Sequence, residues 1–451
     1  MSIALIVLAA GKGTRMQSDL PKVLHKIAHA PMLWHALRAG LVLEPEKTVV
    51  VAGHGADLVQ ASAHEFDPEI QIALQTEQLG TAHAVAQARP ALDGFEGDAI
   101  VLYGDTPFIR EETLAAITQA RVSNDVVVLG FDAIDPGRYG RLITDGDELM
   151  RIVEFKDASP LERSLRLCNS GVISAKAEVL FDLIDAVGNN NASGEYYLTD
   201  IVAIAKSRGL TAGVVRCPEA ETLGVNSRSE LASAEAGFQT LARAELLDNG
   251  VTMHAPDTTF LAWDTVIGRD AEVEPYVIFG PGVTVESEAR IRAFSHLEGA
   301  HVSRGATVGP YARLRPGAEL AEDTHVGNFV EIKNAQVHQG AKVNHLTYIG
   351  DAEIGERTNI GAGTITCNYD GVFKHKTTIG RDAFIGSSTM LVAPVSVGNE
   401  AMTASGSVVT ENVPDGALAI GRAKQVSKPG LATKLFAMLR AKKAKQQAQK
   451  D

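Results

Sequence analysis

The sequence predicts an α/β domain with a mostly parallel sheet, followed by a linker helix and a parallel β-helix. Short apolar runs alternate with helical patterns up to about residue 227, a long helical pattern follows, and aliphatic residues then recur every six positions. Alternating strands and helices are typical of a parallel sheet covered on both faces. A six-residue period is typical of a β-helix built from hexapeptide repeats. The expected domains are therefore residues 1–227, 228–250 and 251–451.

Composition narrows the class of protein. The chain has 451 residues, 45% of them hydrophobic, and a net charge of -13, which argues against general nucleic-acid binding. No apolar run approaches the roughly 18 residues that span a bilayer, and the start "MSIALIVLAAGKG" is expected to be a strand rather than a signal peptide. Three widely spaced cysteines (Cys168, Cys217, Cys367) predict neither a disulfide framework nor a zinc site. We expect a cytoplasmic protein with no nucleic-acid partner and no stable membrane insertion.

The strands of the first domain are expected to be buried on both faces, because they are short, β-branched and almost continuously apolar. They lie at residues 3–10, 47–54, 70–75, 98–105 and 124–131. Helices are expected at 31–40, with Pro31 in the first helical position, at 80–92, and at 228–249 with Gly250 as the carboxy-terminal cap. Ligands of such a sheet bind at the carboxyl ends of its strands, so we expect the site there.

The six-residue period predicts which side chains of the β-helix point inward. Its members are Ile267, Val273, Phe279, Val285, Ile291 and Leu297, then after a one-residue slip Val302, Val308, Leu314, Leu320, Val326 and Ile332, and later Ile354, Ile360, Ile379, Ile385, Leu391 and Val397. The stretch 366–379 interrupts the period and predicts an external loop. A helix from Leu431 to about Lys443 is expected in the basic tail.

The first predicted strand runs into a glycine loop, "VLAAGKGTRM". It fits neither the Walker pattern nor the dinucleotide fingerprint, which needs a third glycine where this chain has Met16. Its backbone N–H groups and Arg15 would face the ligand edge of the sheet, where they can hold phosphate. An ordinary glycine loop is the alternative for this pattern alone.

A second motif, "VLYGDTPFI", ends a buried strand in a carboxylate, Asp105. A metal or a hydrogen bond must offset its desolvation. Hard oxygen ligands, only a few of them from the protein, suit Mg²⁺ that bridges phosphates. A turn or cap aspartate is the alternative if the motif stands alone.

The segment "LAAGKGTRMQSDLPK" resembles the signature of the sugar-1-phosphate nucleotidyltransferases, which have a Rossmann-like domain, use a nucleoside triphosphate and release pyrophosphate. The resemblance implies that Arg15 and Lys22 neutralise phosphate charge and that Asp105 and Asn226 bind Mg²⁺. It also implies base contacts from Gln75, Gly80 and Thr81, and sugar contacts from Gly140, Glu154 and Asn169. Further contacts to the nucleotide are expected from Leu8, Ala9, Ala10, Gly11, Tyr103 and Gly104.

The segments "RLRPGAEL", "GNFVEIKNA", "VNHLTYIGDAEIG" and "TNIGAGTITCNYDG" closely resemble the acetyltransferase half of the bifunctional N-acetylglucosamine-1-phosphate uridyltransferase/glucosamine-1-phosphate acetyltransferase family. The resemblance covers essentially the whole chain. It implies a left-handed β-helix and a homotrimer with the acetyl site between subunits. Histidine titrates in the range needed to deprotonate an attacking amine, and the motif assigns this role to His345.

The same resemblance implies the remaining contacts of the acetyl site. The sugar phosphate would be bound by Arg315, Lys333, Tyr348, Asn359 and Lys374, and acetyl-CoA by Ala362, Asn368, Tyr369, Ser387, Ser405 and Arg422. Lone cations on a β-helix are usually solvated, which is the alternative for Arg315 and Lys333. Ser405 departs from the alanine expected in the family, which weakens inferences about its side chain only.

The expected function is two-step synthesis of UDP-N-acetylglucosamine: acetyl transfer from acetyl-CoA to glucosamine 1-phosphate, then uridylyl transfer from UTP, for cell-wall and lipopolysaccharide synthesis. One alternative is a monofunctional nucleotidyltransferase whose repeats only assemble or sense ligands; His345 with Asn368 and Tyr369 argues against it. Another is a non-catalytic regulatory subunit, which Gly11, Lys22 and Asp105 argue against.

Overall fold

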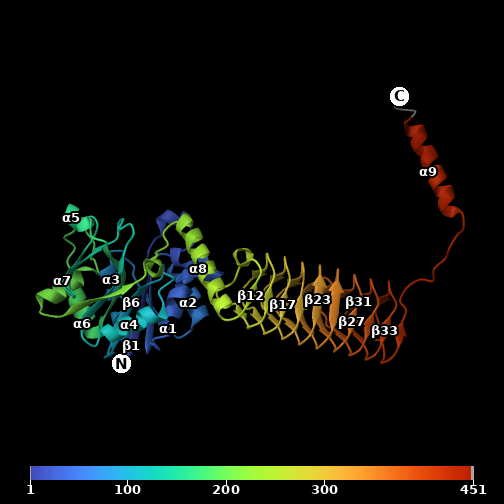
Figure 1. Cartoon of the computed structure of the whole chain (residues 1–451), viewed down its shortest axis with the longest axis horizontal. Coiled ribbons are helices and arrows are strands. Elements are labelled where there is room, and N and C mark those ends of the chain that lie inside the picture. The colour runs from blue at the N-terminus through green and yellow to red at the C-terminus, as the bar shows by residue number, and fades with distance from the viewer. Residues whose placement is uncertain (1, 448–451) are drawn as a thin grey trace. The chain divides into compact units, whose positions relative to one another are not determined.

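The computed structural model describes residues 2–447 (Figure 1). The chain divides into two compact units. The first comprises the chain up to Glu245 together with Leu261–Asp264, and the second comprises Leu246–Phe260 and the chain from Thr265 onward. One unit is built on an α/β sheet and the other on coils of parallel strands, which confirms the predicted fold class.

The α/β unit contains one nine-stranded sheet. In spatial order its strands are β5 (Gln71–Leu74), β4 (Lys47–Ala52), β1 (Ile3–Ala9), β6 (Asp98–Tyr103), β10 (Leu167–Lys176), β7 (Val126–Asp132), β11 (Ala212–Cys217), β9 (Glu148–Val153) and β8 (Arg141–Asp145). All five predicted strands are present. The strands β8 to β11 were not predicted; β10 runs antiparallel to both β6 and β7. The sheet is therefore mixed, with a parallel part formed by β5, β4, β1 and β6.

Strand β1 shows why these sequences form doubly covered strands. Its alternate side chains Ala4, Ile6 and Leu8 belong to one buried cluster, and Leu5, Val7 and Ala9 belong to another. A strand places successive side chains on opposite faces, so an unbroken apolar run buries both. Burial of both faces stabilises the sheet, and the polar residues lie in the loops that follow the strands.

Helices cover the two faces of this sheet. One face packs against α1 (Met32–Leu41), α2 (Ala56–Phe66) and α4 (Glu111–Ala120), and the other against α3 (Thr81–Ala86), α6 (Ala177–Asp185) and α7 (Asp200–Ser207). The short α5 covers Pro160–Arg163.

Two details of the predicted helices were wrong. Pro31 precedes α1 as its N-cap residue rather than starting it. The helix expected at 80–92 is divided into α3 and a 3₁₀ turn at Arg89–Leu92. Pro90 lies in this turn and has no N–H with which to continue an α-helix.

Helix α8 (Arg228–Asp248) confirms the helix predicted at 228–249, and most of it belongs to the first compact unit. Gly250 has φ 87°, and its N–H donates to the Leu247 carbonyl at 3.1 Å, so it caps the helix as expected. Ala234 of α8 lies in a small buried cluster with Ile27 and Met32.

The second unit is a parallel β-helix, seen as successive coils in Figure 1. Its first sheet contains β12 (Thr252–Met253), β14 (Glu272–Val273), β17 (Arg290–Ile291), β20 (Thr307–Val308), β23 (His325–Asn328), β25 (Lys342–His345), β27 (Asn359–Ile360), β30 (Phe384–Ile385), β33 (Met402–Thr403) and β35 (Leu418–Ala419). Each strand pairs with the one in the next coil. The β-helix is therefore built from coils that stack through these strand pairs.

Two further rows of strands complete the coils and share the long strands β24 (Glu331–Val337) and β26 (Tyr348–Ile354). One row adds β15 (Ile278–Phe279), β18 (His296–Leu297), β21 (Arg313–Leu314), β28 (Ile365–Cys367), β31 (Met390–Val392) and β34 (Val408–Val409). The other adds β13 (Val266–Ile267), β16 (Thr284–Val285), β19 (Ala300–Val302), β22 (Ala318–Leu320), β29 (Thr377–Ile379) and β32 (Val395–Val397).

The side chains predicted to point inward are buried. None of the aliphatic or aromatic residues in the six-residue series is more than 6% exposed. Phe279 is in register with Leu297, Leu297 with Leu314, and Leu314 with Ile332. The period therefore predicted both the fold of this unit and its core.

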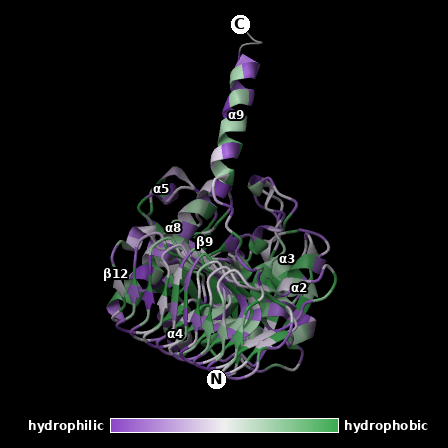
Figure 2. Cartoon of the chain, turned by 90° about the vertical axis from the view of Figure 1, so that its right-hand side faces the viewer, coloured by the Kyte–Doolittle hydropathy of each residue, from purple (hydrophilic) through white to green (hydrophobic). Residues whose placement is uncertain are grey.

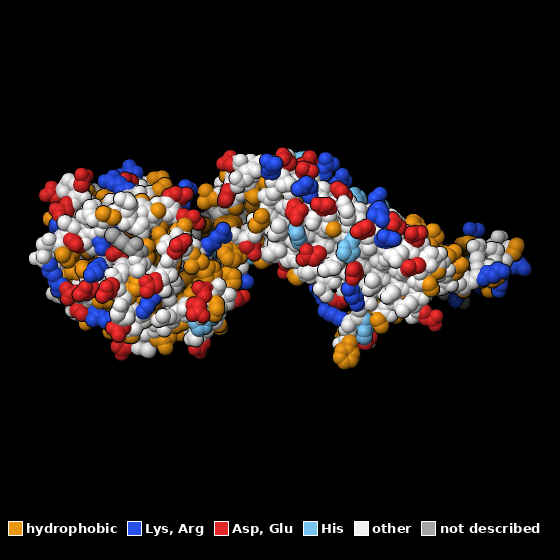
Figure 3. All heavy atoms as spheres, turned by 90° about the horizontal axis from the view of Figure 1, so that it is seen from below, with side chains coloured by type: hydrophobic (Ala, Val, Ile, Leu, Met, Phe, Trp, Pro, Cys, Tyr) orange, Lys and Arg blue, Asp and Glu red, His pale blue; other side chains and the backbone are white. Residues whose placement is uncertain are grey.

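The predicted interruption and the tail helix are also present. Residues 368–376 leave the coil between β28 and β29, with a bridge between Tyr369 and Lys374. Helix α9 (Leu431–Gln447) runs slightly beyond the predicted end and carries hydrophobic and hydrophilic residues along its length (Figure 2). Within residues 2–447, no helix is long and apolar enough to cross a membrane. Figure 3 shows positive and negative side chains interspersed on the face that it draws.

Candidate functional sites

The first site forms around Lys22, Asp105 and Asn226. Asp105 lies just beyond the end of β6, and Asn226 lies just before α8. The Val225 N–H donates to the Asp105 carbonyl at 3.0 Å, which joins the two segments. The Lys22 ammonium donates to the Asp105 carboxylate and, at 3.0 Å, to Asn226 Oδ1. Two oxygen atoms from distant parts of the sequence thus converge on one positive charge.

This donor set fits a divalent cation shared with a substrate. A carboxylate and an amide oxygen suit Mg²⁺, which takes few protein ligands and fills its other positions with phosphate and water. Within residues 2–447, no group of three or more His, Cys, Asp or Glu side chains could hold a metal ion. The residues that the structure describes therefore offer Asp105 and Asn226 as two candidate ligands rather than an all-protein cage.

The glycine loop turns beside these side chains. Gly13 has φ 57°, and a Cβ there would lie 2.7 Å from Lys22 Cβ, so both its conformation and its contact with Lys22 favour glycine. A Cβ on Gly11 would meet nothing within 4 Å, so the space in front of the loop is open. Arg15 lies in the 3₁₀ turn Thr14–Met16. The loop therefore packs tightly against Lys22 at Gly13, whereas the space beside Gly11 is unoccupied by protein atoms.

Helix α8 anchors this loop, which the sequence reading missed. The Arg228 Nε donates to the Met16 carbonyl at 3.3 Å, and its guanidinium lies 3.2 Å from His25 Nδ1. Burial, and then the Arg228 charge, lower the pKa of His25, so the neutral ring can accept from the guanidinium.

Glu230 supports the other side of the site. Its carboxylate accepts from the N–H groups of Asn226 at 2.6 Å and Ser227 at 3.0 Å, and Ser227 Oγ accepts from the Glu230 N–H at 3.3 Å. This is a capping box, and the sequence "SRSE" carries its signature. The cap fixes the backbone of the candidate metal ligand Asn226.

The predicted base-binding residues lie together beyond β5. The Gln75 Nε2 donates to the Gly80 carbonyl at 3.1 Å, and Thr81 Oγ1 accepts from the Leu198 N–H at 2.9 Å. Gly80 has φ 121°, and a Cβ there would lie 2.5 Å from the Tyr196 carbonyl oxygen. No other residue fits this position without moving the Tyr196 backbone.

Strands β1 and β6 present the other predicted nucleotide contacts at the same edge. The Gly104 N–H donates to the Leu8 carbonyl at 2.9 Å, and the Ala10 carbonyl accepts from Gln78 Nε2 at 2.9 Å. Ala9 is the last residue of β1. Burial, followed by the charges of Asp105 and Glu154, raises the pKa of Tyr103, so its phenol stays protonated.

The predicted sugar-binding residues also come together. The Asn169 N–H donates to the Gly140 carbonyl at 2.9 Å, and Glu154 Oε1 lies 3.4 Å from the position of a Cβ on Gly140. Burial raises the pKa of Glu154, although the Thr199 hydroxyl donates to its carboxylate at 3.2 Å. The backbone of Gly140 just before β8, the carboxylate of Glu154 just after β9 and Asn169 of β10 thus form one polar group.

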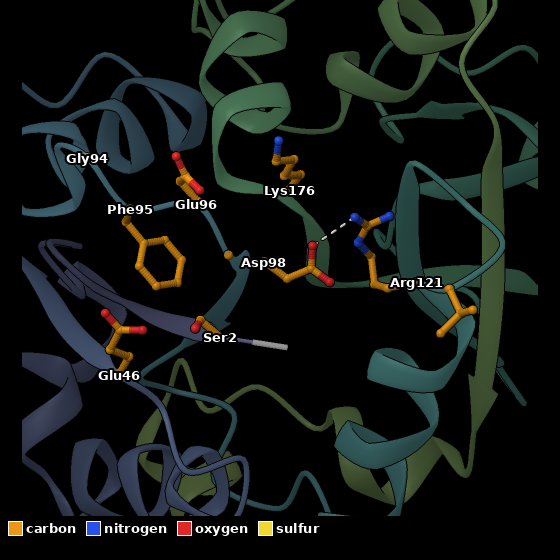
Figure 4. Close-up of a pocket in the computed structure, with 10 residues that line it drawn as sticks. Ser2, Glu46, Gly94, Phe95, Glu96, Asp98, Arg121 and Lys176 are labelled. Carbon is orange, nitrogen blue, oxygen red and sulfur yellow. Dashed lines mark hydrogen bonds and ion pairs between the residues drawn. The ribbon is translucent and has the colours of Figure 1, made fainter.

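A cavity of about 680 Å³ lies at the amino ends of β1 and β6, opposite the strand ends that carry the predicted site residues (Figure 4). It is lined by Ser2 before β1 and by Asp98 at the start of β6, whose carboxylate accepts from Arg121 at 2.8 Å. None of the predicted site residues lines it. Three of its charged residues are acidic (Glu46, Glu96 and Asp98) and Arg121 is paired with Asp98, so the cavity does not favour a phosphate.

In the β-helix, His345 ends strand β25 and lies beside Asn328 of β23. The His345 Nδ1 and Asn328 Oδ1 are 2.9 Å apart, and the two residues are in register. Because Oδ1 only accepts, Nδ1 carries the proton and Nε2 keeps the lone pair. The arrangement leaves Nε2 available as a base; Asn328 was not predicted.

Three cations lie near this histidine's coil. The pKa of Lys333 is lowered by its hydrogen bond with Lys374 and by the Lys374 charge, which means that the two ammonium groups are close. Arg315 donates to the Glu331 carboxylate at 2.9 Å. A phosphate dianion would relieve the repulsion between the two lysines. Lys374 belongs to the external loop, so its contact with Lys333 places part of that loop beside the coil.

A polar network lies next to the lysines. Asp351 accepts from Asn334 Nδ2 at 2.6 Å and from Asn368 Nδ2. Burial raises the pKa of Asp351, but these hydrogen bonds together with the charges of Lys374 and Lys333 lower it overall. Gly350 has no room for a side chain, since a Cβ would lie 2.4 Å from the Tyr348 hydroxyl. Asp351, which was not predicted, thus holds Asn368 on the coil; Tyr369 follows as an exposed residue, 61% accessible.

The predicted coenzyme contacts Ala362, Ser387 and Ser405 form a column on consecutive coils, whereas Asn368 and Tyr369 lie where the external loop begins. The Gly363 N–H donates to the His345 carbonyl at 3.1 Å, the Ser388 N–H to the Ala362 carbonyl at 2.7 Å, and the Gly406 N–H to the Ser387 carbonyl at 2.8 Å. Ser405 precedes Gly406, and the Arg422 side chain comes within 3.9 Å of a Cβ on Gly406. Asn359 begins β27 and is in register with Lys342, so it lies outside this column.

The corner of the coil changes along this column. In earlier coils it carries Tyr276, Phe294, Tyr311 and Phe329, exposed rings that stack with centroids 4.9 to 5.3 Å apart. All have positive φ, as have Leu346, Gly363, Ser388 and Gly406 at the same corner of later coils. Bulky residues therefore give way to small ones where the candidate coenzyme contacts begin.

Comparison with known proteins agrees with this division. Residues 5–144 match the family described as MobA-like NTP transferase domain, and residues 376–411 match the hexapeptide repeat of succinyl-transferase. The fold and sites thus define a nucleotidyltransferase domain joined to a hexapeptide-repeat acyltransferase domain.

Full-length relatives identify the family. The bifunctional protein GlmU of Ruegeria sp. (strain TM1040) is 69% identical over 444 residues, which cover 98% of this chain and 99% of that protein. The same-named protein of Dinoroseobacter shibae is 66% identical over 450 residues, or 100% of both chains. The chain belongs to the bifunctional GlmU family, which confirms the family indicated by the motifs in both halves.

Proposed function

We propose that this protein makes UDP-N-acetylglucosamine in two steps at two separate sites. The β-helix transfers an acetyl group from acetyl-CoA to the amine of glucosamine 1-phosphate. The α/β unit then transfers UMP from UTP to N-acetylglucosamine 1-phosphate and releases pyrophosphate. The convergence of Lys22, Asp105 and Asn226 at the end of β6 is the observation that carries the second step.

In the uridylyl step, a phosphate oxygen of the sugar phosphate attacks the α-phosphorus of UTP. A new phosphorus–oxygen bond forms, the bond to the bridging oxygen breaks, and pyrophosphate leaves with the electron pair. Arg15 and Lys22 would offset the negative charge of both reactants, since such catalysis depends on positioning and electrostatics. Bound to Asp105 and Asn226, Mg²⁺ would supply further positive charge for the phosphates.

The Gly140, Glu154 and Asn169 group would hold the sugar, and Gln75, Gly80 and Thr81 the uracil. The raised pKa of the Glu154 carboxyl, caused by burial, is compatible with hydrogen bonding to sugar hydroxyls. These roles place the base beyond β5 and the sugar near β10, with the triphosphate between them.

In the acetyl step, the amine of glucosamine 1-phosphate attacks the thioester carbonyl. The nitrogen–carbon bond forms, the carbon–sulfur bond breaks, and coenzyme A leaves as the thiolate. His345 Nε2 would take the proton lost by the amine and return it to the departing sulfur. Lys333, Lys374 and Arg315 would bind the phosphate, Tyr348 and Asn359 the sugar, and the column from Ala362 to Arg422, together with Asn368, the coenzyme.

We also propose that the active assembly is a homotrimer formed through the β-helix. The stacked rings of Tyr276, Phe294, Tyr311 and Phe329 are each about half exposed, which leaves apolar surface for burial against another copy. A chain truncated after Gly250 should keep uridylyl transfer but sediment as a monomer. A trimeric truncated protein would overturn the assembly proposal.

The proposed function is tested by omission. The protein is supplied with glucosamine 1-phosphate, acetyl-CoA, UTP and Mg²⁺, and each component is left out in turn while free thiol and pyrophosphate are measured. Omitting acetyl-CoA should abolish both products, and adding N-acetylglucosamine 1-phosphate should restore pyrophosphate alone. If thiol never appears, the acetyl step is wrong; if pyrophosphate never appears, the uridylyl step is wrong.

A further inference from the structure

We propose that His83 fixes the orientation of the Gln75 amide and thereby makes the site selective for uracil over cytosine. This inference rests on the proposed uridylyl transfer. His83 lies in α3 and was not among the predicted site residues. It acts through Gln75 and so would be a positioning residue.

The contacts of Gln75 determine which end of its amide is free. Its Nε2 lies 3.1 Å from the Gly80 carbonyl oxygen and 3.1 Å from His83 Nδ1. A carbonyl oxygen only accepts, so the NH₂ group faces Gly80, and the contact with His83 is a second hydrogen bond that would be lost if the amide were reversed. Gln75 is also buried, with 5% of its surface exposed.

Both hydrogens of the amide are then used within the protein. One goes to Gly80 and the other to the lone pair on His83 Nδ1, which puts the ring proton on Nε2. No donor within residues 2–447 contacts Gln75 Oε1. The group left for a ligand is an acceptor.

The second contact of the imidazole does not alter this assignment. Gln87 Nε2 lies 3.2 Å from His83 Nε2. A neutral ring can accept from only one of the two amides. Gln87 Nε2 also donates to the His83 carbonyl at 2.9 Å and is more exposed, so it does not need the ring as its acceptor. Besides the Gly80 carbonyl, His83 Nδ1 is the only acceptor within residues 2–447 that the buried Gln75 amide contacts.

A fixed acceptor discriminates between pyrimidine bases. The N3 of uracil carries a hydrogen and can donate to Gln75 Oε1. The N3 of cytosine carries a lone pair, so the same oxygen would face an acceptor and neither group would be satisfied. If the amide could turn, its NH₂ group would donate to cytosine N3 and the selectivity would fall.

The test compares two substitutions of His83 that have similar shapes but differ in whether an acceptor replaces Nδ1. In His83→Asn the new Oδ1 is attached as Nδ1 is in histidine and can accept from Gln75. In His83→Leu the shape is similar but no acceptor remains. The kcat/KM values for UTP and CTP are measured with N-acetylglucosamine 1-phosphate and Mg²⁺, and their ratio is the readout.

We expect His83→Leu to lower the UTP-to-CTP ratio by roughly three- to tenfold, the worth of one ordinary hydrogen bond. His83→Asn should stay close to the wild type. Gln87→Leu removes the other neighbour of the ring and should also leave the ratio unchanged. Equal ratios in His83→Leu and His83→Asn would overturn the inference, because a merely structural residue would affect both nucleotides alike.

Failure of the inference and failure of the proposed function give different results. If the wild type makes no pyrophosphate from UTP and N-acetylglucosamine 1-phosphate, the proposed function fails. If the wild type is active and prefers UTP but His83→Leu keeps the full preference, only the role of His83 fails. A wild type that uses CTP as well as UTP would also overturn the inference.

Discussion

The two units build their candidate sites in opposite ways. In the α/β unit, Lys22, Asp105 and Asn226 come from three distant segments and meet at one sheet edge. In the β-helix, Asn328, His345 and Ala362 lie at intervals of 17 residues and meet because each coil stacks on the one before it. A repeat therefore converts sequence spacing directly into proximity, whereas a sheet with crossover connections does not.

The difference also concerns what holds each site in place. The candidate metal ligand Asn226 depends on a helix cap from Glu230, and the glycine loop depends on Arg228, both supplied by α8. The polar groups of the β-helix site are held mainly by residues on their own or neighbouring coils, such as Asp351 for Asn368. The first arrangement needs the whole unit to be folded, and the second needs only adjacent coils.

The strongest test of two independent sites pairs Asp105→Ala with His345→Ala. His345→Ala should lower acetyl transfer by roughly 10²–10⁴-fold, the usual worth of a positioned general base. It should spare uridylyl transfer from supplied N-acetylglucosamine 1-phosphate. Asp105→Ala should do the reverse, because the candidate metal site loses its carboxylate.

Each activity is measured separately, by free thiol and by pyrophosphate. Mixing the two variants should restore the overall conversion, since the acetylated intermediate can diffuse between them. If either variant is folded and has lost both activities, the sites are not independent and the comparison between the units collapses.

A core substitution tests whether the β-helix behaves as a stack. Phe279→Ala should lower the free energy of unfolding by about 3–5 kcal/mol, because it leaves a cavity where a fully buried ring was. Phe384→Ala is the matched control, since that ring is 46% exposed, and should change stability by about 0.5 kcal/mol or less. Denaturant unfolding measures both. Equal effects would contradict the inward assignment that the six-residue period gave.

Removing the neighbour of the proposed base should have a smaller effect. Asn328→Ala leaves His345 without the oxygen that accepts from Nδ1–H, so the ring can turn and kcat for acetyl transfer should fall roughly tenfold. The matched control is Asn344→Ala. Asn344 lies in β25, the strand of His345, but its side chain contacts His325. An unchanged kcat in Asn328→Ala would mean that the base is oriented by other groups.

The smallest expected effect is a shift in pH dependence. Because Lys374 lowers the pKa of Lys333, the wild-type pair loses a proton at lower pH than a single lysine would. In Lys374→Met, Lys333 should keep its charge to higher pH. The rise in KM for glucosamine 1-phosphate on the alkaline side should therefore begin at higher pH than in the wild type.

Lys376→Met is the control for this experiment, since Lys376 lies in the same loop but pairs with Glu353 at 2.8 Å. Its alkaline limb should match the wild type. An alkaline limb that does not move in Lys374→Met would show that the two lysines do not act on one phosphate.

Much of this protein could be predicted from its sequence alone. The six-residue period identified the β-helix core, from Ile267 to Val397, because each coil has the same geometry and so demands the same residue type at the same place. The apolar runs identified β1, β4, β5, β6 and β7, and all but β5 are largely buried on both faces, as expected. The expectation was wrong for β5, which lies at the edge of the sheet with Gln71 and Leu74 exposed. Gly250 was found as a cap because few other residues adopt its conformation.

Only the tertiary structure decided the rest. Strands β8 and β9 carry polar and apolar residues without a clear period, so the sequence did not reveal them, and with β10 they bring Gly140, Glu154 and Asn169 together. Arg228 and Asn328 were not predicted because they contact residues far along the chain or on another coil. His83 was not predicted because its role depends on which of its ring nitrogens carries the proton. Sequence patterns reveal structural requirements that recur along the chain, such as buried core positions and backbone turns. Contacts made once, between side chains that folding brings together, leave no period to find.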